Sequence, residues 1–150
     1  MPMKAFSEND HLGLALRFEV VIDDWELGSW SKCTGLDVSF GLCQYTEGNN
    51  PDFTWYFPGN TKYSNITLTR ACTKESTGVV MKWLEKQLKT PTHGNGSITL
   101  KDAWQEEVAK WNLRRIMPLK WAGPSMDASG SAVATETLEL VHEGFLPLAG

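Results

Sequence analysis

The residues able to do acid–base or metal chemistry are scattered along this sequence and form no catalytic motif. The three histidines are His11, His93 and His142, and no two of them stand at a spacing typical of metal ligands. Adjacent carboxylates occur at 23–24 and 106–107, but neighbouring residues on a strand point to opposite faces and do not form one acid–base site. Phosphate-binding glycine loops and the serine turn of hydrolases are also missing from the sequence. We therefore expect no catalytic residue, no metal and no cofactor.

The cysteines and the charge exclude further classes of protein. Cys33, Cys43 and Cys72 are odd in number and contain no CxxC pair, which argues against a disulfide scaffold or a zinc site. The formal net charge is −4, whereas a protein that binds duplex DNA presents a basic face. Residues 1–11 are polar and lack the apolar stretch of a secretion signal, so we expect them to form a flexible N-terminal arm.

Apolar residues alternate with a period of two through most of the chain, which predicts antiparallel strands. The expected strands cover 12–22, 25–32, 36–46, 65–72, 97–103, 109–117, 118–126 and 132–145. The 150 residues suit one domain with a single core. The fold class expected for 1–150 is therefore mainly β, an antiparallel sandwich or partly closed barrel flanked by one helix.

The sequence predicts that helix at about 74–89. Thr73 can cap its first turn, and Pro91 stops it after Thr90. Apolar residues recur at helical spacing and are expected to face the core: Val80, Trp83, Leu84 and Leu88.

Three of the expected strands have one apolar face and one small or polar face. The apolar faces carry Val38, Phe40 and Leu42; Ile98 and Leu100; and Trp111, Leu113 and Met117. The polar faces carry Asp37, Ser39 and Gly41; Ser97, Thr99 and Lys101; and Lys110, Asn112 and Arg114. We expect the apolar faces to pack against the protein, and the polar faces to contact an aqueous space.

Residues 47–64 contain two clusters of turn residues, which predict a long loop. Loops of this length are uncommon in small domains and are usually functional. This one is rich in aromatic residues, which are costly to leave in water, so we expect it either to pack on its own domain or to be covered by a partner. Acidic neighbours argue against a platform for single-stranded nucleic acid. The residues proposed for an interface, with Trp121 added, are Glu47, Asn49, Asn50, Asp52, Phe53, Trp55, Tyr56, Phe57, Asn60, Tyr63 and Trp121.

Several segments, taken in order, resemble one family. They are FEVVID at 18–23, CTGL at 33–36, YTEG at 45–48, PGNTKYSNITL at 58–68, PLKWAGP at 118–124 and ATETLELVHEG at 134–144. The set is similar to the tail tube proteins of contractile phages and of phage-tail-like contractile injection systems. The connection at 102–110 departs from the family, because it lacks the usual short turn.

This resemblance implies a structural subunit, not an enzyme. Six subunits would form a ring, and rings would stack into a rigid tube inside a contractile sheath. The implied partners are the sheath protein, baseplate and spike, cap or terminator proteins, and cargo protein or DNA carried without specific binding. Assembly would take place in the bacterial cytoplasm, with release by lysis. Membrane insertion is not expected.

The two-faced strands suit such a tube. If each of six subunits gives four strands, a barrel of about 24 strands has a backbone diameter of about 50 Å and a lumen of roughly 40 Å. The nine polar-face residues from Asp37 to Arg114 are then the predicted lumen lining, and 47–64 the predicted contact between rings and subunits. The alternatives are an Hcp-like tube of type VI secretion and a monomeric lipocalin-type barrel that carries a small ligand.

Overall fold

Nine strands and one helix make up the part of the chain that the computed structural model describes, residues 16–46, 48, 54–124 and 134–147. The strands are β1 (Arg17–Ile22), β2 (Trp25–Trp30), β3 (Lys32–Thr34), β4 (Val38–Thr46), β5 (Thr54–Tyr63), β6 (Ile66–Ala71), β7 (Gly94–Lys101), β8 (Glu107–Ala122) and β9 (Thr135–Val141). The helix is α2 (Lys74–Lys89), at the predicted place. The expected mainly β fold with a helix after the middle of the chain is thus confirmed.

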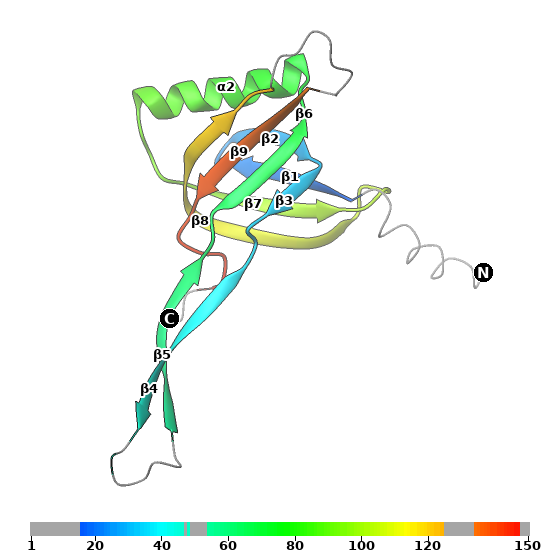
Figure 1. Cartoon of the computed structure of the whole chain (residues 1–150). Helices are drawn as coiled ribbons and strands as arrows, with labels where there is room; N and C mark the ends of the chain where they lie inside the picture. Colours follow the sequence, from blue (N-terminus) through cyan, green and yellow to red (C-terminus); the bar gives the residue numbers. More distant parts are fainter. Residues whose placement is uncertain (1–15, 47, 49–53, 125–133, 148–150) are drawn as a thin grey trace, which may run out of the picture.

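Seven strands form one antiparallel sheet in the order β2-β1-β7-β8-β9-β6-β3. Its two end strands, β2 and β3, follow each other in the chain with Ser31 alone between them. Ser31 donates from its backbone N–H and its hydroxyl to the Thr69 carbonyl on β6, at 3.1 and 2.9 Å. The sheet therefore curls into a partly closed barrel, and α2 lies across one end of it (Figure 1).

β8 joins the two halves of this sheet. It pairs with β7 from Glu107 to Ile116 and with β9 from Met117 to Ala122. The sequence predicted two strands here, at 109–117 and 118–126, and this division is wrong. Pro118 does not end β8, although proline cannot donate a ladder hydrogen bond. Positive φ at Arg115 shifts the alternation, so that Ile116 is buried where Met117 was expected.

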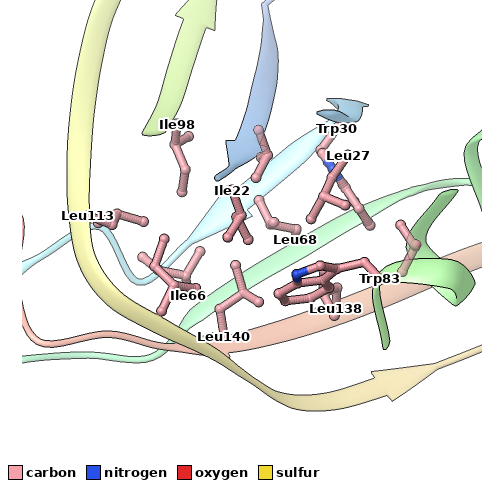
Figure 2. Close-up of a cluster of buried hydrophobic side chains, with 13 residues drawn as sticks. Ile22, Leu27, Trp30, Ile66, Leu68, Trp83, Ile98, Leu113, Leu138 and Leu140 are labelled. Atoms are coloured by element: carbon pink, nitrogen blue, oxygen red, sulfur yellow. The ribbon is translucent and has the colours of Figure 1, made fainter. Parts of the chain in front are cut away.

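The core fills the space between the walls of the curled sheet and under the helix (Figure 2). Its buried hydrophobic side chains are Val20, Ile22, Leu27, Trp30, Ile66, Leu68, Val80, Trp83, Ile98, Leu113, Ile116, Leu138 and Leu140. Seven of them lie on one face of β1, β6, β7 or β9, as the alternation of those strands requires: Val20, Ile22, Ile66, Leu68, Ile98, Leu138 and Leu140. At about 1.5–3 kcal/mol for each large side chain buried, this cluster is the main favourable term for the fold.

The helix begins where its cap was predicted, and the Thr73 hydroxyl oxygen accepts from the Ser76 N–H at 3.2 Å. Val80 and Trp83 are buried as expected. Leu88 is not, because its side chain is 83% exposed, and Gln87 is buried in its place. At 100° per residue, Gln87 lies between Val80 and Trp83 around the helix, whereas Leu88 points well away from them. The expected core position of Leu88 was therefore wrong.

Candidate assembly surfaces

β4 and β5 form a two-stranded antiparallel hairpin that projects from the sheet (Figure 1), and we call these two strands the arm. The prediction of a loop over 47–64 is wrong, because Thr54–Tyr63 is a strand paired along most of β4. The turn-like Pro58 and Gly59 lie inside this strand, at a β-bulge. A Cβ on Gly59 would lie 2.5 Å from the Gly41 carbonyl oxygen, so the two strands approach too closely there for a larger residue.

The arm exposes large apolar side chains on both of its faces. Cross-strand partners share a face, so Tyr45 and Trp55 lie on one side, and Leu42 lies on the other with the opposite pair Gln44 and Tyr56. The exposed set is Phe40, Leu42, Tyr45, Trp55, Tyr56 and Phe57, with exposed fractions from 46% to 64%. The expectation that Phe40 and Leu42 pack against the protein is wrong for the single chain. Isolated two-stranded hairpins are marginal in water, so this surface calls for a covering partner.

The base of the arm rests on the segment that follows β9. Tyr63 packs edge-on against His142 and Phe145, with ring centroids 5.5 and 5.1 Å apart. Just beyond β5, the Ser64 hydroxyl donates to the Asp37 carboxylate at 2.6 Å. Asn60 is exposed on β5. The predicted interface residues Glu47, Asn49, Asn50, Asp52 and Phe53 lie outside the described residues.

The outward side of β1, β7 and β8, opposite the core, forms a second surface, which we call the polar face. The register pairs Ser97 with Asn112 and Thr99 with Lys110, so four of the predicted lumen residues lie side by side. β1 adds Glu19 opposite Thr99. Glu19 also forms an ion pair with Lys101, another predicted lumen residue, and this pair offsets part of the local positive charge.

Arg114 also belongs to this side, but its side chain is held by its own chain. Its guanidinium donates to the Leu146 carbonyl, and its backbone N–H donates to the Gly144 carbonyl at 3.0 Å. A groove of about 860 Å³ runs beside it between β7, β8 and the segment after β9. Asp37, Ser39 and Gly41 are not brought onto the polar face. Asp37 precedes β4, and Ser39 and Gly41 lie on the arm.

Trp121, which the sequence placed at an interface, packs against the core from the last part of β8. Its indole Nε1 is buried and has no hydrogen-bond partner among the described residues. The connection at 102–110 is organised by Asp102, whose Oδ1 accepts from the N–H groups of Trp104 and Glu106 at 2.9 and 3.0 Å. This side-chain turn lies where the sequence was found to lack a short turn.

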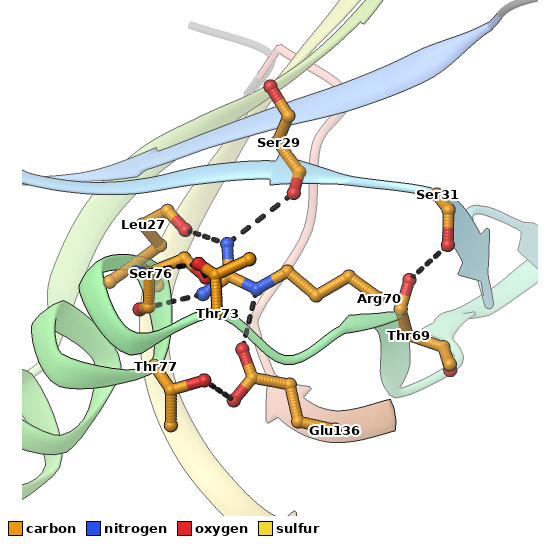
Figure 3. Close-up of polar contacts among 9 residues, drawn as sticks. All are labelled: Leu27, Ser29, Ser31, Thr69, Arg70, Thr73, Ser76, Thr77 and Glu136. Carbon is orange, nitrogen blue, oxygen red and sulfur yellow. Dashed lines mark hydrogen bonds and ion pairs between the residues drawn. The ribbon is translucent and has the colours of Figure 1, made fainter. Parts of the chain in front are cut away.

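A buried ion pair between Arg70 and Glu136 was missed by sequence reasoning (Figure 3). Arg70 Nε donates to Glu136 Oε1 at 2.5 Å, and its other nitrogens donate to the carbonyls of Leu27 and Ser76 at 2.6 and 2.9 Å. The second oxygen of Glu136 accepts from the Thr77 hydroxyl at 2.9 Å. The sequence did contain a signal for the burial of Arg70, because this residue continues the alternation of the buried Ile66 and Leu68 on β6. The network fixes the first turn of α2 to β2, β6 and β9.

In the described part of the chain, no three His, Cys, Asp or Glu side chains are grouped to hold a metal ion. Within the same residues, a helix with the length and hydrophobicity of a membrane span is absent.

The polar face, the arm and the curled sheet together suit a subunit that contacts other chains. Comparison with known families identifies the family of this subunit. Residues 14–146 match the family model described as T4-like virus tail tube protein gp19. The chain belongs to this tail tube protein family. Curated protein sequences give no significant match to it.

Solved structures with the same fold include chains from contractile particles. This chain superposes with TM-score 0.71 on a chain of the cryo-EM structure of an extracellular contractile injection system, PVC sheath-tube complex in extended state. The two sequences are 25% identical, and the match covers 85% of each chain. This chain also superposes with TM-score 0.69 on a chain of the PVC sheath/tube terminator in extended state, at 25% identity over 85% of this chain and 90% of that one. A type six secretion system protein, at 9% identity and TM-score 0.54 over 85% and 80%, shares the fold alone. The resemblance read from the sequence is thus confirmed.

Proposed function

We propose that this chain is the structural subunit of the hollow inner tube of a contractile phage tail or contractile injection particle, and that it has no catalytic activity. Membership of the tail tube family over residues 14–146 carries the proposal. Six subunits form a ring, rings stack into a tube, and a sheath surrounds it. The chain matched at TM-score 0.71 comes from a sheath-tube complex, which supports a sheath as a partner. A baseplate and spike, a cap and a terminator complete the particle, which assembles in the bacterial cytoplasm.

The arm supplies the contacts between rings or neighbouring subunits. It projects beyond the barrel, and both of its faces carry exposed aromatic residues (Figure 1). Aromatic side chains give a large contact area at a low entropic cost, as interface hot spots do. Burying them against another copy would remove the largest set of exposed apolar side chains in the described part of the chain. Tyr45, on β4, joins the predicted interface residues Trp55, Tyr56 and Phe57.

The polar face lines the lumen. Ser97, Thr99, Lys110 and Asn112 form a mainly small or polar patch, and the Glu19–Lys101 pair lowers its net charge. Such a wall is wetted, and its mixed charge gives little specific attraction for a passing protein or for DNA. The filled core behind it (Figure 2) disfavours the alternative of a barrel that carries a small ligand.

Negative-stain electron microscopy of the purified protein at rising concentration, with and without a baseplate fraction as seed, tests this function. We expect six-fold rings and tubes with a central hole of roughly 40 Å, the width that a barrel of about 24 strands implies. Protein that stays monomeric at every concentration, even when seeded, would contradict the proposal.

A further inference from the structure

His142 stands where three parts of the chain meet: the end of β9, the base of the arm and the segment 143–147. Its ring contacts Tyr63 on the arm, as described above, and lies 6.2 Å from the ring of Phe145. Both of its nitrogens are hydrogen bonded. Nε2 lies 3.0 Å from the Ser64 carbonyl oxygen, and Nδ1 lies 3.1 Å from the Gly144 backbone nitrogen. His142 thus connects the base of the arm to the barrel.

These partners fix the protonation state of the imidazole. A backbone N–H can only donate, so Nδ1 must present its lone pair to Gly144. A carbonyl oxygen can only accept, so Nε2 must carry the proton that is shared with Ser64. Both bonds exist together only in the neutral ring with its proton on Nε2. A second proton, on Nδ1, would point at the Gly144 N–H and abolish that bond.

Gly144 is poorly placed to adjust to such a change. Its φ is +135°, and a Cβ there would lie 2.4 Å from Arg114 Nη2 and 2.7 Å from the Tyr63 ring. Its carbonyl also accepts from the Arg114 N–H. The turn at 142–144 therefore packs tightly between β8 and the base of the arm. Loss of the hydrogen bond to Nδ1 would disturb its contacts with both.

The charged groups around the ring oppose one another. Arg114 on β8 repels the imidazolium form, whereas Asp37, before β4, attracts it. Glu143 forms an ion pair with Arg115 at 2.7 Å, and the uncharged Tyr63 ring contacts the imidazole in a T-shaped arrangement. Burial is the largest influence and lowers the pKa of His142 below its ordinary value near 6.5. The neutral ring is accordingly the form present at neutral pH.

We propose that His142 is a protonation-controlled latch, which holds the base of the arm against the barrel while its ring is neutral and releases it when Nδ1 is protonated. Because the folded chain resists the proton, the latch is complete above pH 6.5 and weakens as pH falls below that value. The inference concerns the single chain and does not depend on the tube. If the arm does join rings, its orientation, and therefore assembly, becomes sensitive to acid.

The test is a distance measured by pulsed electron resonance on the unassembled, dilute chain. Spin labels are placed on the exposed Cys43 of the arm and on Lys86→Cys of α2, in a background with Cys33→Ala and Cys72→Ala. We expect a narrow distance distribution at pH 8 and one at least twofold wider at pH 5. His142→Asn keeps an acceptor for the Gly144 N–H at every pH, so its distribution should not change with pH. His93→Asn is the matched control, because His93 is exposed and bonded to Arg115, and it should respond as the parent does.

A second measurement needs no variant. In an NMR titration of the unmodified chain, His142 should be the Nε2–H tautomer at pH 8. The Gly144 amide shift should then follow the same midpoint as the ring, below 6.5. The latch is refuted if the width of the spin-label distance distribution does not change between pH 8 and pH 5, or if the distribution of His142→Asn still broadens in acid. It is also refuted if the chemical shift of the Gly144 amide does not follow the titration of His142.

Discussion

Arg70 and Glu136, 66 residues apart in the sequence, form an ion pair in the interior with Nε and Oε1 2.5 Å apart. Their side chains are 5% and 0% exposed. The Arg70 guanidinium also stacks 3.9 Å from the centroid of the Trp30 ring. Removing one partner of such a pair leaves an uncompensated charge in the interior, which costs much more than the pair itself contributes.

We expect Glu136→Leu to lower the free energy of unfolding by about 3–5 kcal/mol, because Arg70 is left buried without its carboxylate. The double variant Arg70→Met, Glu136→Leu should lose much less than the sum of the two single variants, since neither charge then remains. Urea denaturation followed by tryptophan fluorescence measures all three values.

The matched control is the exposed pair Glu85 and Lys89, whose side chains are 61% and 72% exposed. Glu85→Gln should change the free energy of unfolding by no more than about 0.5 kcal/mol. A Glu136→Leu cost as small as that of Glu85→Gln would show that the interior pair does not hold α2 to the sheet.

Replacing Tyr45 and Tyr56 by threonine tests the arm as an assembly surface. The two side chains lie on opposite faces of the arm and are 57% and 59% exposed. Loss of two interface aromatics, at about 1–2 kcal/mol each, should weaken association by roughly 30- to 1,000-fold, with the stability of the single chain almost unchanged. Sedimentation and electron microscopy report the tube yield.

Leu88→Gln is the control for this double variant, because it removes an apolar side chain that is 83% exposed but belongs to α2. It should leave the tube yield unchanged. Normal tubes from the Tyr45, Tyr56 double variant would exclude these two residues from the contact.

Asn112→Cys tests which way the polar face points in a tube. Asn112 is exposed on β8 opposite Ser97, and Lys86 is exposed on α2. In preformed tubes of a Cys43→Ser background, a cysteine at 112 should react with a small maleimide but be shielded from one carrying a long polymer. A cysteine at 86 lies outside the proposed lumen and should react with both. Equal reaction of Asn112→Cys with the two reagents would rule out the lumen assignment.

Two of the three thiols, those of Cys33 and Cys43, should differ in reactivity in the folded chain. Burial raises the pKa of Cys33 to about 11, whereas Cys43 is exposed on the arm. At pH 8 a thiol with that pKa is roughly 0.1% thiolate, and the thiolate is the reactive form. Iodoacetamide should therefore alkylate Cys43 at least about 100-fold faster than Cys33, as peptide mass spectrometry will show. In denaturant the two rates should become similar, and equal rates in the folded chain would contradict the burial of Cys33.

Much of the fold was predictable from the sequence, because its signals are local. Alternation placed Ile66, Leu68 and Ile98 in the core, since successive side chains on a strand point to opposite faces. The helix was bounded at both ends by Thr73 and Thr90, because capping is decided by residues within one turn. The polar sides of β7 and β8 were also correctly grouped, since alternation decides the face of each residue, but their cross-strand register comes from the structure alone.

Contacts between distant residues were decided only in the tertiary structure. Pro58 and Gly59 favour a turn by themselves, yet pairing with β4 and the close approach of Gly41 make them part of a strand. Arg70 and Glu136 can be buried only because each meets the other, along with the carbonyls of β2 and α2. His142 likewise acquires its tautomer from Ser64 and Gly144. A buried polar group is acceptable only when its partner is in place, and the partner's position is a property of the folded chain.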